Sequence, residues 1–268
     1  MERRHFLAGS AAASAVALAG KGSAVAQSAG TPAAGEKARE YYQIRRYKLQ
    51  SGPGGKLTNG YLENALIPAL HRLGFGPVGA FNLTYGPETP TLYVVMPSSN
   101  LETLVTVDLK LAEDAEFMKA AEAFWNAPAV SPAFLRVDSS LHVAFEGWPK
   151  LTPPDTTKKR IVQLRTYDSP GYGAHVRKME MFHHGEFAIF QRSGCGQVFY
   201  GETLVGGHVP SLTYMLTFPD MAALDTGWKA FTSDPEWKTL SGSPRYSSEA
   251  IVNNVDNLVL TPTSYSQI

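Results

Sequence analysis

Residues 162–167 read VQLRTY, and residues 42–47, which lie 120 positions earlier, read YQIRRY. The same offset relates further pairs of segments, namely 67–78 with 187–198, and 100–104 with 220–224. Another match, between residues 123–128 and 230–235, has an offset of 107 and predicts extra residues around 104–118 in the first half. Several matches in the same order indicate a chain built from two copies of one structural unit.

Each half has the same predicted order of elements. Alternating apolar and polar residues, rich in β-branched and aromatic types, predict strands, and apolar residues at helical spacing predict helices. In the first half the order is strand 41–48, helix 56–73, strands 78–85 and 91–96, helix 100–125 and strand 138–146. In the second half it is strand 160–167, helix 173–193, strands 197–203 and 211–218, helix 220–240 and strand 248–260.

The order β-α-β-β-α-β, found twice, predicts an α+β protein made of two tandem ferredoxin-like repeats. The antiparallel sheet of such a unit has helices on one face only, so its other face needs cover. Two repeats can supply that cover by packing their sheets together, and we therefore expect an arrangement like a dimeric α/β barrel.

The predicted domain boundaries follow from the duplication. The first repeat spans 41–150 and the second 160–262, and residues 151–159 (LTPPDTTKK) have the composition of a linker. Residues 27–40 are small and polar, and we expect them to form a flexible leader.

The first 26 residues have the three parts of a signal peptide. A basic start with arginine at positions 3–4 precedes a 13-residue run of Ala, Gly, Ser, Val and Leu at 8–20, and residues 24–26 (AVA) form a cleavage site. That run is too short to cross a bilayer of about 30 Å as a helix. The arginine pair followed by Phe6-Leu7 is typical of twin-arginine signals, the alternative being a general secretory signal. We therefore expect cleavage after Ala26 and export to the periplasm or beyond the cell.

Charge and composition exclude several classes of protein. The formal charge of the whole chain is 0, and loss of the predicted signal peptide removes three basic residues and one acidic residue, which leaves −2. A near-neutral chain without a basic cluster is not expected to bind nucleic acid. Outside the signal peptide no segment reaches 18 consecutive apolar residues, so no membrane span is expected. Cys195 is the single cysteine, which rules out an intrachain disulfide.

Several motifs resemble the NIPSNAP family. They are the strand at Gln163 to Tyr167 followed by Pro170-Gly171, the helix end Phe190 to Gly194, and the strand Val198 to Gly201. The resemblance extends over about residues 40–262 and is closer in the second half. It implies a dimeric α/β-barrel type of ferredoxin-like fold. Relatives on that fold include cofactor-free monooxygenases and haem-binding proteins, but the family implies no settled reaction, so the cofactor and the catalytic residues stay unknown.

Polar residues suited to ligand binding gather in the second half. The predicted ligand-binding residues are those on the helix at 173–193 and on the neighbouring strands: His175, His183, Glu186, Glu202, Tyr214 and Arg165. His183 lies on the apolar stripe of the helix and needs a hydrogen-bond partner, from either a ligand pocket or the protein itself. Glu202 is either a base facing the barrel interior, where burial would raise its pKa, or a solvated carboxylate. His183-x-x-Glu186 lacks evident partners on a second helix, so no metal is predicted.

Two functions remain open from the sequence. In the first, the protein binds or converts an unidentified small molecule in a pocket of the second repeat. In the second, it is a non-catalytic interaction protein of the periplasm, and assembly into a homo-oligomer is open in either case. A ligand site predicts a cavity that touches at least three of the six residues above, whereas an interaction protein predicts a filled interior and an exposed apolar patch.

Overall fold

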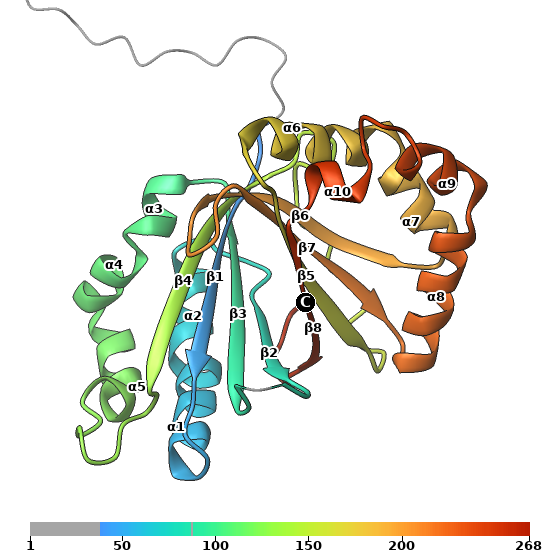
Figure 1. The fold of residues 1–268 in the computed structure, drawn as a ribbon. Helices are drawn as coiled ribbons and strands as arrows, with labels where there is room; N and C mark the ends of the chain where they lie inside the picture. The colour runs from blue at the N-terminus through green and yellow to red at the C-terminus, as the bar shows by residue number, and fades with distance from the viewer. Residues whose placement is uncertain (1–37, 87) are drawn as a thin grey trace, which may run out of the picture. The chain divides into compact units, whose positions relative to one another are not determined.

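Eight antiparallel strands of one chain close into a barrel in the computed structural model, which describes residues 38–86 and 88–268 (Figure 1). The predicted signal peptide and nearly all of the predicted leader lie outside these residues. The strands are β1 (Tyr41–Lys48), β2 (Gly79–Leu83), β3 (Thr91–Ser98), β4 (Arg136–Ala144), β5 (Ile161–Asp168), β6 (Gly196–Val205), β7 (Ser211–Phe218) and β8 (Asn254–Pro262). Their order around the barrel is β1-β3-β2-β8-β5-β7-β6-β4.

Each half contributes one four-stranded sheet to the barrel. The first half forms β4-β1-β3-β2 and the second forms β8-β5-β7-β6, which is the same order within each half. The two sheets join where β2 pairs with β8 and where β4 pairs with β6. Pairing at both seams removes every open sheet edge, so a single chain closes the barrel without a second copy. The predicted α+β class with ferredoxin-like sheets and a barrel is therefore confirmed.

The helices lie outside the barrel, against the sheet of their own half (Figure 1). In the first half they are α1 (Pro53–Tyr61), η1 (Leu62–Leu66), α2 (Ile67–Arg72), α3 (Leu101–Val105), α4 (Val107–Glu113) and α5 (Ala115–Trp125). In the second they are α6 (Tyr172–Met181), η2 (Phe182–Glu186), α7 (Phe187–Arg192), α8 (Met221–Ser233), α9 (Pro235–Ser241) and α10 (Ser248–Ile251). The π-helical turns η1 and η2 occupy equivalent positions, so the long first helix of both repeats widens at the same point.

An ion pair at equivalent positions shows where the two repeats align. Asp114 caps α5 and binds Arg72 at 2.6 Å, and Asp234 caps α9 and binds Arg192 at 2.6 Å. Both ion pairs keep the offset of 120, so the prediction of extra residues around 104–118 in the first half is wrong. The offset changes to 118 only at the last strand, since β4 begins at Arg136 and β8 at Asn254. The match at offset 107 joined aromatic residues of helices that are not equivalent.

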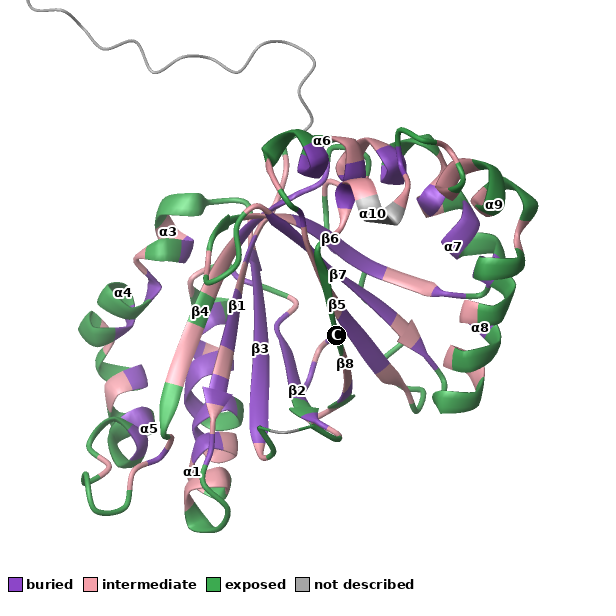
Figure 2. Ribbon diagram, in the orientation of Figure 1, coloured by how far each residue is buried: buried purple, intermediate pink, exposed green. Residues whose placement is uncertain are grey.

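Among the described residues, the three largest of four apolar clusters hold the barrel and its helices together. One core lies between helices and sheet in the first half, where Tyr61 stacks on Phe124 at 3.7 Å. Another lies in the second half, where Phe190 stacks on Phe231 at 4.4 Å. The third fills part of the barrel interior, and the strands that enclose it are largely buried (Figure 2).

The barrel interior is apolar toward one end and polar toward the other. Along β1 the inward side chains change from Tyr42 and Ile44 to Arg46 and Lys48, and along β5 they change from Val162 and Leu164 to Thr166 and Asp168. Four antiparallel pairings separate β1 from β5 around the barrel, so the two strands run in the same direction and their polar ends meet at the same opening. We call this opening the polar mouth. Within the described residues, no helix is both long and apolar enough to cross a membrane.

Candidate ligand site in the barrel

A cavity of about 540 Å³ lies inside the polar mouth. Both repeats contribute to its wall, through strands β1, β3 and β4 of the first and β5 to β8 of the second. The apolar lining residues are Ile44, Tyr93, Val137, Leu164 and Leu258, and the polar ones include Arg46, Asp138, Ser140, His142, Thr166, Thr203, His208, Ser211, Thr213 and Asp256. The cavity thus offers an apolar floor below a wall of hydroxyl, imidazole and charged groups.

His142 is a buried polar residue of this wall, with 2% of its surface exposed. It lies on β4 next to an irregularity in the β4–β6 pairing, and such irregularities re-aim side chains. Its Nε2 lies 2.8 Å from Ser140 Oγ, and its Nδ1 lies 3.1 Å from Thr203 Oγ1. Burial lowers the pKa of His142 to about 4, so the imidazole is neutral at pH 7.

A close approach of backbone makes room for His142. A Cβ placed on Gly201 of β6 would lie 2.9 Å from the His142 Cβ and 3.4 Å from Tyr42 Cδ2. Only glycine fits there without movement of its neighbours. Close packing next to the cavity therefore explains why glycine is required at position 201, which also belongs to the NIPSNAP-like motif of β6.

A second histidine lies at the rim. His208 Nδ1 is 2.8 Å from Asp168 Oδ2, and this hydrogen bond is the main cause of the raised pKa of His208. Because Asp168 stabilises the charged form of His208 and burial disfavours the charged form of His142, the pKa values of these two histidines are shifted in opposite directions. The rim therefore favours the charged form of histidine and the interior favours the neutral form.

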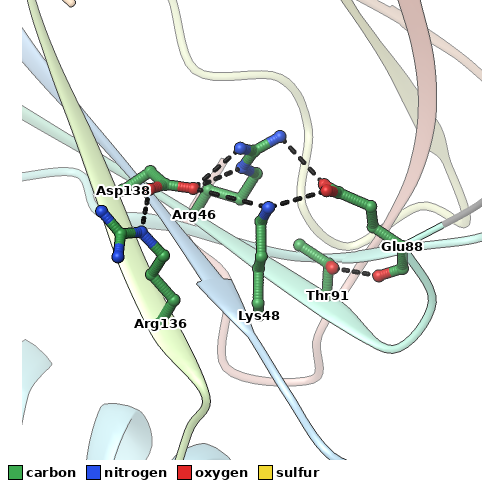
Figure 3. Close-up of polar contacts among 6 residues, drawn as sticks. All are labelled: Arg46, Lys48, Glu88, Thr91, Arg136 and Asp138. Atoms are coloured by element: carbon green, nitrogen blue, oxygen red, sulfur yellow. Dashed lines mark hydrogen bonds and ion pairs between the residues drawn. The ribbon is translucent and has the colours of Figure 1, made fainter. Parts of the chain in front are cut away.

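Charged residues form a chain of ion pairs along one side of the mouth (Figure 3). Arg46 binds Asp138 at 2.7 Å and Glu88 at 3.0 Å, and Lys48 binds Glu88 at 2.7 Å. Arg136 binds the other oxygen of Asp138 at 3.1 Å. The hydrogen bond from Arg46 lowers the pKa of Asp138, and that from Lys48 lowers the pKa of Glu88. These opposite charges largely balance, so the mouth presents no strong field of one sign.

The six residues proposed from the sequence lie outside this cavity, on the helix-facing side of the second sheet or on the helices that cover it. His175 Nε2 is 3.2 Å from Glu202 Oε1, and that hydrogen bond is the main cause of the lowered pKa of Glu202. Glu202 therefore packs under α6, with a pKa shifted in the direction opposite to that expected for a barrel-interior base.

His183 is held entirely by backbone. Its Nδ1 lies 2.8 Å from the carbonyl oxygen of Met179, and its Nε2 lies 3.0 Å from the amide nitrogen of Gly147. The amide can only donate, so Nε2 accepts and Nδ1 carries the proton. His183 thus joins η2 to the loop after β4 and has no ring nitrogen left for a ligand.

Glu186, Arg165 and Tyr214 belong to one buried polar cluster beneath α6. Glu186 pairs with Lys178, and burial raises the pKa of Glu186. Tyr167 links the other two, with its hydroxyl 2.9 Å from Arg165 Nη2 and 3.1 Å from the hydroxyl of Tyr214. The structure therefore brings these three together, but in a packed layer. Among the described residues, no group of three or more His, Cys, Asp or Glu is arranged to hold a metal ion.

The residues of the cavity carry a pattern that sequence reasoning passed over. Asp138, Ser140 and His142 alternate along β4, so all three project to the same side of the strand. Polar residues at every second position of a strand that belongs to a barrel indicate that this face of the strand lines a cavity. Histidines gather in the second half and drew the prediction there, whereas His142 lies in the first half.

Comparisons with known proteins agree with this fold. Residues 162–267 match the NIPSNAP family, so the C-terminal half of the chain is a NIPSNAP domain. No curated protein matches the chain. In solved structures, the fold is similar to that of a candidate monooxygenase from Fusobacterium nucleatum (8% identity, 84% of this chain and 93% of that one, TM-score 0.57).

A candidate monooxygenase from Lactobacillus acidophilus has the same fold (10% identity, 84% of this chain and 94% of that one, TM-score 0.54). An uncharacterized NIPSNAP-like domain protein from Burkholderia xenovorans is 21% identical over 40% of this chain and 88% of its own, with a TM-score of 0.36. At these identities the first two likenesses establish the fold, an α+β barrel of the dimeric α/β-barrel type, and not an activity.

Proposed function

We propose that this protein binds a small, oxygen-bearing organic molecule in the cavity of the polar mouth, and that both repeats form the site. The observation that carries the proposal is a closed barrel whose interior is filled at one end and hollow at the other. Core packing alone favours a filled interior, since proteins are packed as densely as organic crystals. A hollow lined by convergent polar groups over an apolar floor is the usual form of a ligand site.

The lining indicates the class of ligand. A cavity of about 540 Å³ lies within the range of roughly 300–1,000 Å³ typical of small-molecule sites. Ser140, Thr166, Thr203, Ser211 and Thr213 offer hydroxyl groups that both donate and accept, which suits carbonyl, hydroxyl or ester oxygens. The ion pairs of the mouth balance one another, so a net ligand charge is not required. An apolar part of the ligand would contact Ile44, Leu164 and Leu258.

The alternative, an interaction protein with a filled interior, is less well supported because the barrel is hollow at the polar mouth. The fold likeness to two candidate monooxygenases fits a protein that binds or converts small molecules, but the proposal stands on the cavity. A separate ligand site at His175 and Glu202, inside the second repeat, stays a prediction.

Blocking the cavity tests the proposed function. Thr166 lies on the wall and its hydroxyl is 2.9 Å from that of Thr213, so Thr166→Trp would fill the hollow. Thr232→Trp, at an exposed position of α8, is the matched control. A library of small oxygenated compounds is screened by thermal shift, together with native mass spectrometry for co-purifying molecules. We expect ligands that stabilise the wild type and Thr232→Trp but not Thr166→Trp. Ligands that stabilise all three proteins equally would contradict the proposal.

We also propose that the chain is exported by the twin-arginine route and cleaved after Ala26. Support comes from the arginine pair at positions 3–4, the short apolar run and the cleavage site alone. Mass spectrometry of the protein from cell fractions tests this, with both arginines replaced by lysine as the comparison. A mature chain that begins at Gln27 only when the arginine pair is intact would support the route, and an uncleaved cytoplasmic chain would contradict it.

A further inference from the structure

Two side chains in the cavity form the pairing that activates a serine nucleophile. Ser140 Oγ lies 2.8 Å from His142 Nε2, and both residues line the hollow. A nucleophile in hydrogen-bond contact with a base, which is itself oriented by a third group, is the recurring arrangement of covalent catalysis. His142 has such a third group, because Thr203 Oγ1 lies 3.1 Å from its Nδ1.

Hydroxyl groups lie on both sides of the His142 imidazole. Ser211 Oγ lies 2.6 Å from the carbonyl oxygen of His208 and 2.8 Å from Thr203 Oγ1, and it is the donor in both contacts. Ser140 and Thr203 can each donate to or accept from the imidazole, so their contacts suit either neutral tautomer. A base for Ser140 requires the tautomer in which His142 Nδ1–H donates to Thr203 Oγ1 and Nε2 accepts from the Ser140 hydroxyl.

Thr203 Oγ1 is placed to accept from His142 Nδ1–H and so to support the tautomer that a general base needs. Thr203 and Ser211 are positioning residues, since they reach Ser140 only through His142. Burial keeps His142 neutral at pH 7, so the accepting nitrogen is free of a second proton. The sequence supports this placement, because Ser140 and His142 are two residues apart on β4 and share one side of the strand.

We propose that Ser140 is a nucleophile activated by His142, and that the cavity hydrolyses small carboxylic esters. This proposal rests on the proposed function, because it assigns a chemistry to the same cavity. Ser140 Oγ bonds to the ester carbonyl carbon while its proton moves to His142 Nε2. The carbon–alkoxy bond then breaks, and Nε2 returns the proton to the departing alcohol. Water hydrolyses the acyl-serine in the reverse manner, which regenerates Ser140 and yields the acid.

The surroundings of Ser140 suit this reaction. Arg46, Thr166 and Thr213 line the same hollow and can donate hydrogen bonds to a developing oxyanion. The loop after β6 passes beside the serine as backbone alone, since a Cβ on Gly206 would lie 3.3 Å from the Ser140 Cβ. The apolar floor offers a place for the acyl chain. Chains of a few carbons are expected to fit, because the cavity is about 540 Å³.

The test is covalent labelling of the full chain with an alkyl fluorophosphonate, followed by intact-mass and peptide mass spectrometry, together with hydrolysis of p-nitrophenyl butyrate. We expect one adduct, on Ser140, that is absent from Ser140→Ala. Thr203→Val, which removes the acceptor of Nδ1–H, is expected to slow labelling by about 10²-fold or more, whereas Thr203→Ser keeps a hydroxyl and restores the rate. Thr232→Val, at an exposed position of α8 outside the cavity, is the matched control and labels like the wild type.

Three outcomes would each overturn the proposal: no adduct in the wild type, an adduct that persists in Ser140→Ala, or equal labelling of Thr203→Val and Thr232→Val. Thermal unfolding of every variant shows whether it is folded, and His142→Gln serves as a second probe of the base. Ligands found by thermal shift are also tested on Ser140→Ala. If they still bind there while no labelling occurs in the wild type, ester hydrolysis is rejected and the proposed ligand site stands.

Discussion

Lys178 of α6 and Glu186 of η2 form an ion pair in which the two side chains are 5% and 2% exposed. The ammonium also lies 4.7 Å from the centre of the Phe182 ring and 5.2 Å from that of Tyr167. The equivalent positions of the first repeat, 120 residues earlier, hold Thr58 and Leu66. One repeat therefore buries a charge pair where the other buries a hydroxyl and an apolar side chain.

The pair predicts a marked difference between single and double substitutions. Glu186→Leu leaves the Lys178 ammonium buried without its partner and is expected to destabilise the fold by about 3–5 kcal/mol. Lys178→Met with Glu186→Leu removes both charges and is expected to be nearly neutral or stabilising. Urea unfolding of the two single variants and the double variant measures this. A double variant as unstable as the sum of the two single ones would contradict it.

His142 predicts a loss of stability in mild acid. Its pKa in the folded protein is about 4, below the ordinary value near 6.5, so the unfolded chain takes up a proton first as the pH falls. The stabilising effect is complete above pH 6.5 and is lost between about 6.5 and 4, by about 3 kcal/mol. The free energy of unfolding is compared between pH 7.5 and 4.5 for the wild type and His142→Gln. Equal acid losses in the two proteins would show that His142 does not titrate in this way.

Gly201 predicts a steric effect next to the cavity. The methyl group of Gly201→Ala would lie 2.9 Å from the His142 Cβ, so we expect destabilisation by about 1–3 kcal/mol and displacement of the histidine. Gly207→Ala is the matched control, because no atom lies within 4 Å of a Cβ at that position. Thermal unfolding compares the two variants. A Gly201→Ala protein as stable as the control would mean that β4 and β6 separate easily at this seam.

His183 predicts a structural effect without a functional one. His183→Ala removes the acceptor of the Gly147 amide at an exposed site, where water can replace it, and is expected to destabilise the protein by about 0.5–1.5 kcal/mol. Because His183 lies outside the cavity, ligand binding at the polar mouth should be unchanged at temperatures where the variant is folded. Isothermal titration with a ligand from the thermal-shift screen provides the measurement. A weaker ligand affinity in His183→Ala would contradict this prediction and show that His183 contributes to ligand binding.

Sequence periodicity alone determined the architecture of this protein. The offset of 120 between residues 42–47 and 162–167, with alternation in strands and helical spacing between them, indicated two β-α-β-β-α-β units, because such patterns reflect local backbone geometry. The repeat also indicated that the two sheets cover each other. The alignment of residues 123–128 with 230–235 was wrong, because the two similar Ala-Phe pairs lie in helices that are not equivalent, α5 and α8.

Only the tertiary structure decided which polar residues meet. The histidines and glutamate of residues 175–186 looked like a site because they are close in sequence, yet His183 is bound to backbone and Glu186 to Lys178. His142 and Thr203 stand 61 residues apart and come together only where β4 of one repeat pairs with β6 of the other. A strand's alternation fixes which residues share a face. Whether that face lines a hollow or a packed layer depends on how two distant sheets close, which is a property of the whole barrel.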